Sequence, residues 1–371
     1  MRIGIDAKWF HEGPPSGNVV TRNLVENLVK VNEQDDLFFF LDRRAMREPF
    51  PYPDSRVHPI YVWADNNLIS NLLVLPKYAK RLSLEVVLFQ NFAPPTSRFK
   101  RIAYVHDVLF LSNPEYYSLI ERAYFAPLRP LCRLADGVCT VSDTERVRMI
   151  THGYVKEGHD IKVAYHGVSD IFRPVEEFSV ECQNAVRAQY QLPPAYLLYV
   201  GRLNVRKNIK NLIKALPLLR AKNIPLCVVG ARNWKMDDLD ELLSIREIGD
   251  RVKFLGPLHG EELACVYAMA SVFCFPSFAE SFGLPPLEAM KCAVPVIVSD
   301  RTSLPEICGE AGNYVNPDSP RDIAGVLDAL LENPELSAMK RRLGVERAKM
   351  FTWENTAKTV LGYIHTVAAR P

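Results

Sequence analysis

Short segments that are apolar at nearly every position alternate along the chain with longer amphipathic segments. Strands of a parallel sheet that is covered on both faces have this continuous pattern, rich in Val, Ile and Phe. The longer segments, such as 212–220, 261–270 and 321–332, are expected to be the helices between them. The expected strands are 2–5, 37–41, 57–62, 86–89, 101–105, 137–141 and 161–164 in the first half, and 196–200, 226–229, 252–254, 272–275, 296–298 and 312–315 in the second.

Two successive series of β-α units predict an α/β protein with two Rossmann-like, doubly wound domains. A length of 371 residues suits two ordinary domains. Prolines in segments 172–174 and 192–194 interrupt regular structure and mark the boundary. The expected divisions are an N-terminal domain over 1–170, a linker over 171–193, a C-terminal domain over 194–351, and a last helix, about 352–371, that can dock back on the N-terminal domain.

Composition and charge exclude several classes of protein. The formal net charge is +2, so no strong overall field attracts nucleic acid. The eight cysteines contain no C-x-x-C pair and mostly lie in apolar runs, which is typical of reduced core thiols. No apolar run reaches the roughly 20 residues of a membrane span, and the N-terminus has the pattern of a strand rather than of a signal peptide. We expect a cytoplasmic protein, with peripheral contact at the inner face of a membrane left open.

The first segment that suggests chemistry is the loop after the strand at 196–200. Gly201 turns the chain there, and Arg202 and Lys207 precede a helix that begins near Asn208. Open α/β sheets bind ligands at loops after the carboxyl ends of their strands. An arginine fork and a lysine charge suit a diphosphate. The alternative is that both residues are solvated surface cations.

The second segment is the strand–loop–helix stretch 275–290. Gly283 allows a ligand to approach the backbone closely, and two prolines at 285 and 286 suit the first turn of the helix. Free amides and the positive end of the helix dipole can bind phosphate without a metal. Glu280 lies in the loop and Glu288 in the helix. A carboxylate accepts hydrogen bonds from the vicinal hydroxyls of a sugar or a ribose.

Segment 280–288 resembles the E-x7-E motif of retaining GT-B glycosyltransferases, in particular glycosyltransferase family 4. Segment 201–207 resembles the phosphate-binding loop of that family. Segment 165–174 is similar to its N-G-V…F-x-P stretch, with His166 where the family commonly has asparagine. The resemblance implies a GT-B fold, two Rossmann-like domains facing a central cleft, and a hexosyltransferase that uses a nucleotide sugar.

The resemblance also implies roles for single residues. Arg202 and Lys207 would neutralise the donor diphosphate. Glu288 would bind the nucleotide ribose, and Glu280 would bind hydroxyls of the donor sugar. Together with the backbone of the two loops, the implied donor-binding residues are Gly17, Gly201, Arg202, Lys207, Glu280, Ser281, Phe282, Gly283, Leu284 and Glu288.

Two residues of the N-terminal half complete the predicted site. Gly17 precedes a helix near 19–31 and resembles the glycine-containing first loop of the family, although an ordinary turn has the same composition. His106 follows the strand at 101–105. In the family a histidine at this place faces the reacting sugar, so we expect His106 to position it. The alternative is a structural histidine. Asp107 is expected to orient its ring or the local turn.

These residues suit a transfer in which negative charge grows on the departing diphosphate. The family resemblance implies retention of configuration, with the leaving phosphate helping to deprotonate the acceptor. No metal and no other cofactor is expected. The segment Asp238-Leu239-Asp240 has the spelling of a metal-binding D-x-D motif, but it lies in an acidic helix-like stretch, so we interpret it as a solvated face. The residues expected to act in catalysis are His106, Arg202, Lys207 and Glu280.

Segments 90–95 and 113–117 look like those of bacterial polysaccharide mannosyltransferases. This favours GDP-mannose as the donor, with UDP-sugars as the alternative, and a role in cell-surface polysaccharide biosynthesis. Different functions on the same fold are a phosphorylase, an epimerase or a non-catalytic nucleotide-sugar binding module. A phosphorylase needs a pyridoxal-bearing lysine, for which the sequence offers no candidate. The complete set of motif residues argues against a module that has lost activity.

The acceptor is expected to be a glycan or a lipid-linked sugar, bound by the N-terminal domain. Segment 67–76 is apolar and runs into Lys77, Lys80 and Arg81, and segment 124–133 mixes apolar with basic residues. Apolar side chains beside cations are typical of segments that lie on an anionic membrane. The alternative is two core helices with solvated basic edges.

Overall fold

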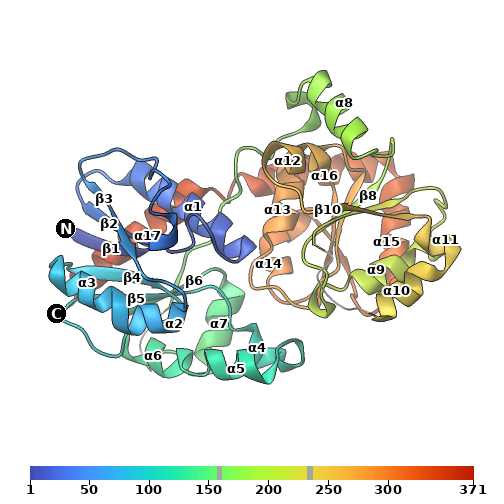
Figure 1. Ribbon diagram of the computed structural model, residues 1–371. Coiled ribbons are helices and arrows are strands. Elements are labelled where there is room, and N and C mark those ends of the chain that lie inside the picture. Colours follow the sequence, from blue (N-terminus) through green and yellow to red (C-terminus); the bar gives the residue numbers. More distant parts are fainter. Residues whose placement is uncertain (157–160, 232–236) are drawn as a thin grey trace. The chain divides into compact units, whose positions relative to one another are not determined.

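The computed structural model describes residues 1–156, 161–231 and 237–371. Within them the chain forms two compact units, which can be followed by colour in Figure 1. Unit 1 comprises Met1–Gly167 with Thr352–Pro371, and unit 2 comprises Val168–Phe351. None of the helices in these described ranges combines the length and the apolar character needed to cross a bilayer.

Unit 1 is built on a seven-stranded sheet in the order β3-β2-β1-β4-β5-β6-β7. All neighbours are parallel, and Ile3 of β1 lies opposite Leu37 of β2 and Val86 of β4. The strand order therefore reverses between β1 and β4. The strands are β1 (Arg2–Asp6), β2 (Asp36–Asp42), β3 (Val57–Val62), β4 (Val86–Gln90), β5 (Lys100–Val105), β6 (Gly137–Thr140) and β7 (Lys162–Val163).

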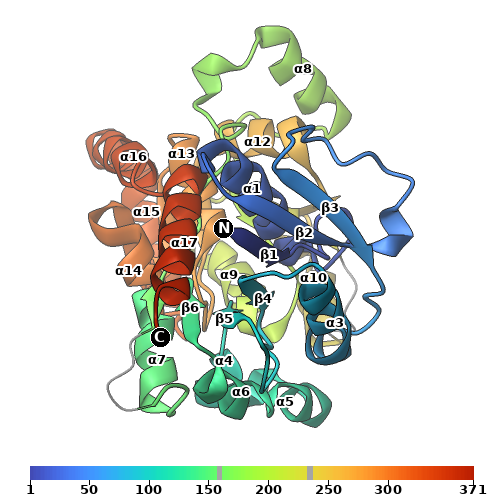
Figure 2. The ribbon, with the colours of Figure 1, turned by 90° about the vertical axis from the view of Figure 1, so that its left-hand side faces the viewer.

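Helices cover both faces of this sheet, as Figures 1 and 2 show. Val87 and Phe89 face a core that includes α3, α6 and α7, while α17 packs along α1 and against β4 and β5. The helices are α1 (Pro15–Val31), α2 (Asn67–Ile69), α3 (Leu75–Arg81), α4 (Leu109–Ser112), α5 (Leu119–Phe125), α6 (Leu128–Leu134), α7 (Asp143–Thr151) and α17 (Trp353–Ala368), with a π-helical turn over Ser70–Val74.

Unit 2 is built on a six-stranded parallel sheet in the order β10-β9-β8-β11-β12-β13. Its strand order reverses between β8 and β11, where Leu197 lies opposite Val272. The strands are β8 (Leu197–Val200), β9 (Leu226–Val229), β10 (Val252–Gly256), β11 (Val272–Phe275), β12 (Val296–Ser299) and β13 (Gly312–Val315). Two doubly wound, Rossmann-like sheets were expected from the sequence, and this part of the prediction is confirmed.

One face of the unit 2 sheet packs on α9, α10, α11 and α15, and α13 packs between the other face and α16. The helices are α8 (Val180–Gln189), α9 (Ile209–Ala215), α10 (Asp237–Ser244), α11 (Arg246–Gly249), α12 (Gly260–Ala268), α13 (Leu284–Lys291), α14 (Leu304–Cys308), α15 (Pro320–Glu332) and α16 (Pro334–Ala348).

Two local differences from the sequence prediction have simple causes. Segment 171–193, expected as a linker, belongs to unit 2 and contains α8, which packs on α12. Helix α9 ends at Ala215 rather than near 220, and a 3-10 turn follows over Leu216–Leu218. Pro217 lies in that turn, where it cannot donate the hydrogen bond that would continue the helix.

Candidate functional site

The two motif loops of unit 2 lie beside each other because they follow paired strands. Segment 201–208 follows β8, segment 276–283 follows β11, and these strands are neighbours at the point where the strand order reverses. Open α/β sheets bind ligands at this kind of position. The structure thus brings together two segments that are about 70 residues apart in sequence.

Hydrogen bonds fasten one loop to the other. The amide of Phe278 donates to the carbonyl oxygen of Arg206 (2.8 Å). The side-chain amide of Asn208 donates to the carbonyl oxygen of Pro276 (2.8 Å), and the guanidinium of Arg206 donates to that of Ala279. Because these bonds involve backbone groups of both loops, they hold the two segments in one arrangement.

Three charged side chains meet where the loops join. Glu280 pairs with Lys207 (2.7 Å) and with Arg206 (3.2 Å), and its side chain is only 8% exposed. The Lys207 ammonium also lies 4.7 Å from the centre of the Phe275 ring. Arg202 is exposed to solvent, and its carbonyl oxygen accepts a hydrogen bond from Tyr199 (3.2 Å). Lys207 and Glu280 are therefore direct partners, whereas Arg202 lies at the surface.

The same contacts set the protonation of this cluster. Burial lowers the pKa of Lys207 to about 8, although the charge of Glu280 partly compensates. Burial works against ionisation of Glu280, but the charges of Lys207 and Arg206 outweigh it and lower the pKa of this carboxyl. When they are ionised, the three side chains that meet, Arg206, Lys207 and Glu280, sum to one positive charge, and the exposed Arg202, whose charge acts on Lys207, brings the loop cluster to two positive charges.

The loop after β11 ends in a helix whose N-terminus is not capped by any described side chain. Gly283 is the N-cap residue and has φ +124°, a conformation that favours glycine. It leads into Leu284, the first residue of α13. The hydroxyl of Ser303 donates to the carbonyl oxygens of Glu280 (3.0 Å) and Phe282 (2.7 Å). These bonds fix the backbone that includes Ser281, in front of the positive end of the α13 dipole.

Glu288 lies one turn inside α13 and has an aromatic partner. Its carboxylate accepts a hydrogen bond from the hydroxyl of Tyr267 (2.8 Å), which is fully buried on α12. Burial raises the pKa of Glu288 to about 7, and the Tyr267 hydroxyl offsets this only partly. Glu288 can therefore change its charge near neutral pH.

In unit 1, the structure corrects the expected position of Gly17. This residue lies in the first turn of α1, which begins at Pro15, and not in a loop before a helix at 19. A proline suits the start of a helix because its missing N–H would have no partner there. A Cβ atom on Gly17 would lie 3.0 Å from the ring of Trp9, so the glycine allows close packing on the indole.

His106 follows β5 and is held by a residue that sequence analysis did not identify. Its Nε2 lies 2.5 Å from Oε1 of Gln90, at the end of β4. Trp9 and His166 lie beside its ring, with centroids 6.4 and 5.8 Å away. Burial lowers the pKa of His106 to about 4, and Asp6 opposes this only partly. The imidazole is therefore neutral at pH 7. Asp107 accepts a hydrogen bond from Tyr117 (3.4 Å).

The segment with the spelling of a metal-binding D-x-D motif is helical. The acidic segment 238–240 lies in α10, where Leu239 is buried and Asp240 is exposed, and the Asp238 side chain lies outside the described residues. Among the side chains that the structure describes, no group of three or more His, Cys, Asp or Glu residues is arranged to hold a metal ion.

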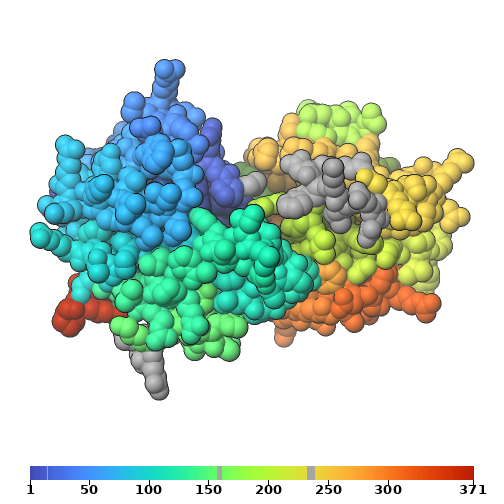
Figure 3. Space-filling view, turned by 60° about the horizontal axis from the view of Figure 1, so that its bottom comes forward, coloured from blue at the N-terminus to red at the C-terminus, as the bar shows by residue number. Residues whose placement is uncertain are grey.

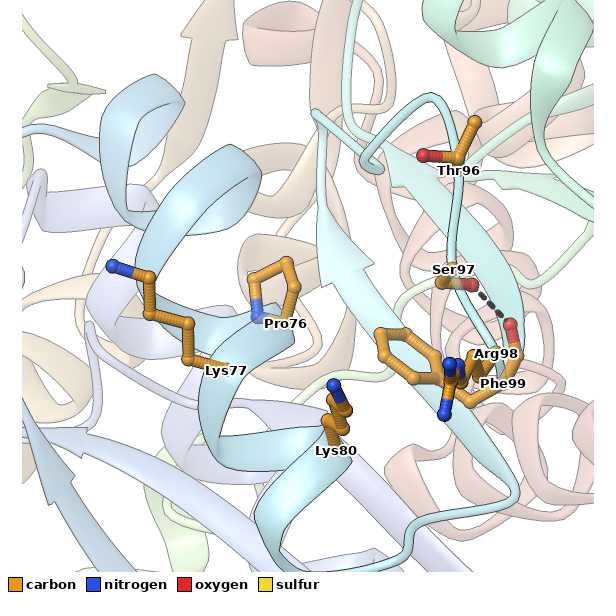
Figure 4. A pocket seen from close by; sticks show the side chains of 7 residues that line it. All are labelled: Pro76, Lys77, Lys80, Thr96, Ser97, Arg98 and Phe99. Atoms are coloured by element: carbon orange, nitrogen blue, oxygen red, sulfur yellow. Dashed lines mark hydrogen bonds between the residues drawn. The ribbon is translucent and has the colours of Figure 1, made fainter.

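The basic edge predicted in unit 1 is present on α3. Lys77, Lys80 and Arg81 are exposed, and the first two line an open pocket between α3 and segment 96–99 (Figure 4). Arg98 brings a further cation to this pocket from the opposite side.

The second predicted surface segment, 124–133, is corrected by the structure. Its apolar residues Leu128 and Leu131 are buried in the core of unit 1, because α6 turns them toward the sheet. Apolar side chains that do reach the surface in this part of unit 1 are Leu119 (73% exposed) and Ile120 (82% exposed) of α5 and Leu134 (46% exposed) of α6, and Figure 3 shows the face formed by this part of the chain.

Several residues of the site were not found from the sequence. These residues, each of which contacts a motif residue or its loop, are Arg206, Asn208, Tyr267, Ser303, Trp9 and Gln90. Arg206 lies inside the motif loop directly before Lys207, and this pair of adjacent cations is a signal for it in the sequence.

Comparison with known proteins relates both halves of the chain to sugar-transferring enzymes. The sequence profile described as "Glycosyl transferases group 1" matches residues 183–346. The chain is 32% identical over 279 residues to O-antigen chain mannosyltransferase B of Escherichia coli, covering 74% of this chain and 72% of that protein. It is 29% identical to O-antigen chain mannosyltransferase RfbU of Salmonella typhimurium, over 76% and 73% of the two chains. Serotype-specific mannosyltransferase WbdA of Escherichia coli is 28% identical, but the match covers 32% of its length.

Solved structures share the fold over the whole chain. Sucrose-phosphate synthase from Thermosynechococcus elongatus has a TM-score of 0.78 at 22% identity, with both chains fully covered. Anabaena HepE in complex with UDP and glucose has a TM-score of 0.73 at 18% identity, with coverage of 99% and 100%. At these identities the likeness shows the fold, which is the GT-B fold expected from the motifs.

Proposed function

This chain belongs to the group 1 glycosyl transferases, and from that premise we propose that it transfers mannose from GDP-mannose to a hydroxyl group of a growing cell-surface polysaccharide. The predicted family and the hexosyltransferase class are confirmed. The observation that carries the choice of mannose is the similarity to the two O-antigen chain mannosyltransferases, which extends over about three quarters of the chain.

The charge of the loop cluster supports diphosphate binding. The cluster is positive by two, which matches a doubly charged diphosphate, and the N-terminus of α13 adds its dipole. We assign Arg202, Lys207 and the amides around Gly283 to the diphosphate. Arg206 keeps Glu280 ionised and in place. Glu280 would then accept hydrogen bonds from hydroxyls of the donor sugar, while Lys207 turns its remaining N–H groups to the phosphates.

Glu288 is assigned to the ribose of the nucleotide. Its carboxylate keeps acceptor positions besides the one taken by Tyr267, and vicinal hydroxyls can donate to them. Tyr267 holds the carboxylate in one orientation because its own ring is fully buried. His106 in unit 1 is assigned to the donor sugar, and Gly17 with the start of α1 to the phosphates and the acceptor.

The proposed transfer retains the anomeric configuration. The bond between the anomeric carbon and the diphosphate breaks, and the acceptor oxygen forms its bond to the same face of that carbon. The acceptor proton passes to an oxygen of the leaving diphosphate. Positive groups around the diphosphate stabilise the charge that grows there, so they act more strongly in the transition state than in the ground state.

The acceptor is proposed to be lipid-linked and presented at a membrane. Exposed Ile69 and Leu73 lie in the helical segment that continues into α3, beside the cations Lys77 and Lys80. Apolar side chains next to exposed cations suit the boundary between acyl chains and anionic headgroups.

A donor panel tests the proposal. The protein is mixed with GDP-mannose, UDP-glucose or UDP-galactose and a mannose-terminated lipid-linked acceptor, and release of the nucleoside diphosphate is measured. We expect turnover with GDP-mannose at a kcat/KM at least tenfold above that with either UDP-sugar, and NMR of the product should show the anomeric configuration of the donor. Faster turnover with a UDP-sugar, or an inverted product, would contradict the proposal.

A further inference from the structure

Four buried polar residues, linked to one another by hydrogen bonds, lie at the carboxyl ends of β1 and β4 in unit 1. Asp6, Lys8, Asn71 and Gln90 are each at most 3% exposed. β1 and β4 are paired at the reversal of the strand order, the place where a sheet of this type binds ligands. Burying a polar group costs free energy, so four of them buried together at this place call for an explanation.

The orientation of the Gln90 side chain is fixed by its contacts. Its Nε2 donates to the carbonyl oxygen of Asp6 (3.2 Å), and its backbone amide donates to the Asp6 carboxylate (3.2 Å). Since the amide nitrogen points to a carbonyl, the amide oxygen must point the other way, to Nε2 of His106 at 2.5 Å. An amide oxygen can only accept a hydrogen bond, so Nε2 of His106 carries the proton.

The remaining members of the set hold Asp6 and Gln90 in place. The Lys8 ammonium pairs with the Asp6 carboxylate (2.5 Å) and donates to Oδ1 of Asn71 (2.6 Å). The side-chain amide of Asn71 in turn donates to the carbonyl oxygen of Gln90 (3.0 Å). Asn71 belongs to the π-helical turn Ser70–Val74, an irregularity that is frequent at functional sites.

We propose that Gln90 is a positioning residue that fixes His106 as its Nε2–H tautomer, which leaves Nδ1 to accept a hydrogen bond from a hydroxyl of the donor sugar. This inference rests on the proposed role of His106 in binding that sugar. A protonated imidazole has no acceptor. The arrangement therefore needs a neutral ring, and the burial of His106 favours that form.

The charged and titratable groups that face His106 come from several elements. Asp6 and Lys8 lie at the end of β1, Tyr104 lies on its own strand, and His166 follows β7. Asp6, which is paired with Lys8, acts to raise the pKa of His106, and burial lowers the pKa of His166 well below its usual value. Glutamate in place of Gln90 would add an unbalanced negative charge next to Nε2 and raise the pKa of His106.

The tautomer is measured first, by nitrogen-15 NMR of the full chain with labelled histidine at pH 7. The eight histidines are distinguished by comparison with His106→Asn. We expect His106 to show a protonated Nε2 and an unprotonated Nδ1. A protonated Nδ1, or a charged ring at pH 7, would overturn the inference whatever the donor assays show, because the tautomer is read on the wild-type chain and His106→Asn serves only to assign its signal.

Two substitutions of Gln90 then test the link to turnover. Gln90→Met should lower kcat by about tenfold or more and abolish the tautomer preference. Gln90→Glu should retain activity above neutral pH and lose it as the pH falls, at least one pH unit earlier than the wild type. Gln183→Met is the matched control, because in the described part of the chain the Gln183 amide donates to the backbone carbonyls of Val175 and Phe178 in unit 2.

The two measurements separate the possible failures. The expected tautomer with unchanged kcat and an unchanged pH profile in folded Gln90 variants would reject the contact between His106 and the donor sugar, and with it that part of the proposed function. The wrong tautomer, with normal donor specificity, would reject only the role of Gln90.

Discussion

The carboxylate of Glu288 combines partial burial, a hydrogen bond from the Tyr267 hydroxyl and a pKa near 7. We expect Glu288→Gln to weaken binding of the nucleoside diphosphate about tenfold or more, because the ribose hydroxyls lose an acceptor in a site of low exposure. Isothermal titration calorimetry measures this directly.

In Glu280→Gln, by contrast, Lys207 is released from its partner, so binding of the free nucleotide should not weaken, while kcat should fall. Equal losses of affinity in the two variants would contradict the assigned roles.

The stability of the protein should also depend on Glu288. Its pKa in the folded state is raised to about 7 from an ordinary value of 4.5, so ionising it destabilises the folded state. The unfavourable contribution is absent below about pH 4.5 and grows as the pH rises to about 7. Glu288→Gln should therefore unfold like the wild type in urea at pH 4.5, and be more stable at pH 8 by roughly 3 kcal/mol. An identical difference at both pH values would reject the raised pKa.

At the scale of elements, the loop after β11 depends on the segment that follows β12. Ser303→Ala removes the hydroxyl whose single proton is shared between the carbonyl oxygens of Glu280 and Phe282. We expect the KM for the donor to rise about three- to tenfold, with a stability loss of about 1–2 kcal/mol. Ser319→Ala is the matched control, since it removes the N-cap of α15 at a cost of about 1 kcal/mol. If Ser303→Ala and Ser319→Ala raise the KM by the same factor, the effect comes from a general loss of stability in unit 2 and not from the loop after β11.

Helix α3 is the element to which membrane contact is assigned. Neutralising Lys77, Lys80 and Arg81 together by substitution with Gln should reduce sedimentation with anionic liposomes at low salt by at least tenfold. Each cation near an anionic surface contributes on the order of 1 kcal/mol. The control is Lys340→Gln in unit 2, where the Lys340 ammonium donates to the carbonyl oxygens of Glu310 and Gly312. A wild-type protein that stays in the supernatant would reject the assignment.

At the scale of the whole molecule, the net charge of +2 is small, and the positive charge that matters is local to the loop cluster. Arginine, lysine and a helix N-terminus can supply the charge that a metal ion supplies in other transferases. We therefore expect initial rates to stay within about twofold of the untreated enzyme after dialysis against excess EDTA. Loss of activity that Mn²⁺ or Mg²⁺ restores would show that the cluster is not sufficient.

The amino-acid sequence by itself determined the succession of strands, loops and helices and, through the motifs, the family. Parallel strands with both faces covered are apolar throughout, so their pattern is visible locally, and each motif loop joins one strand to the next helix. The sequence could also nominate Lys207, Glu280 and Glu288 as candidate donor-binding residues, because each lies in a motif loop or in the helix that follows it. The linker at 171–193, the start of α1 at Gly17, the end of α9 and the burial of Leu128 and Leu131 were misjudged, because domain limits, helix ends and helix rotation depend on neighbouring elements.

The tertiary structure decided which of these side chains face each other. Glu280 pairs with Arg206 as well as Lys207, Glu288 has Tyr267 as its partner, and Gln90 holds His106. Each of these contacts joins different elements, and the spacing of residues along one element carries no information about the strand or helix that packs beside it. The order of strands in the sheet sets those neighbours, and burial among them sets whether His106 and Glu288 carry a charge at neutral pH.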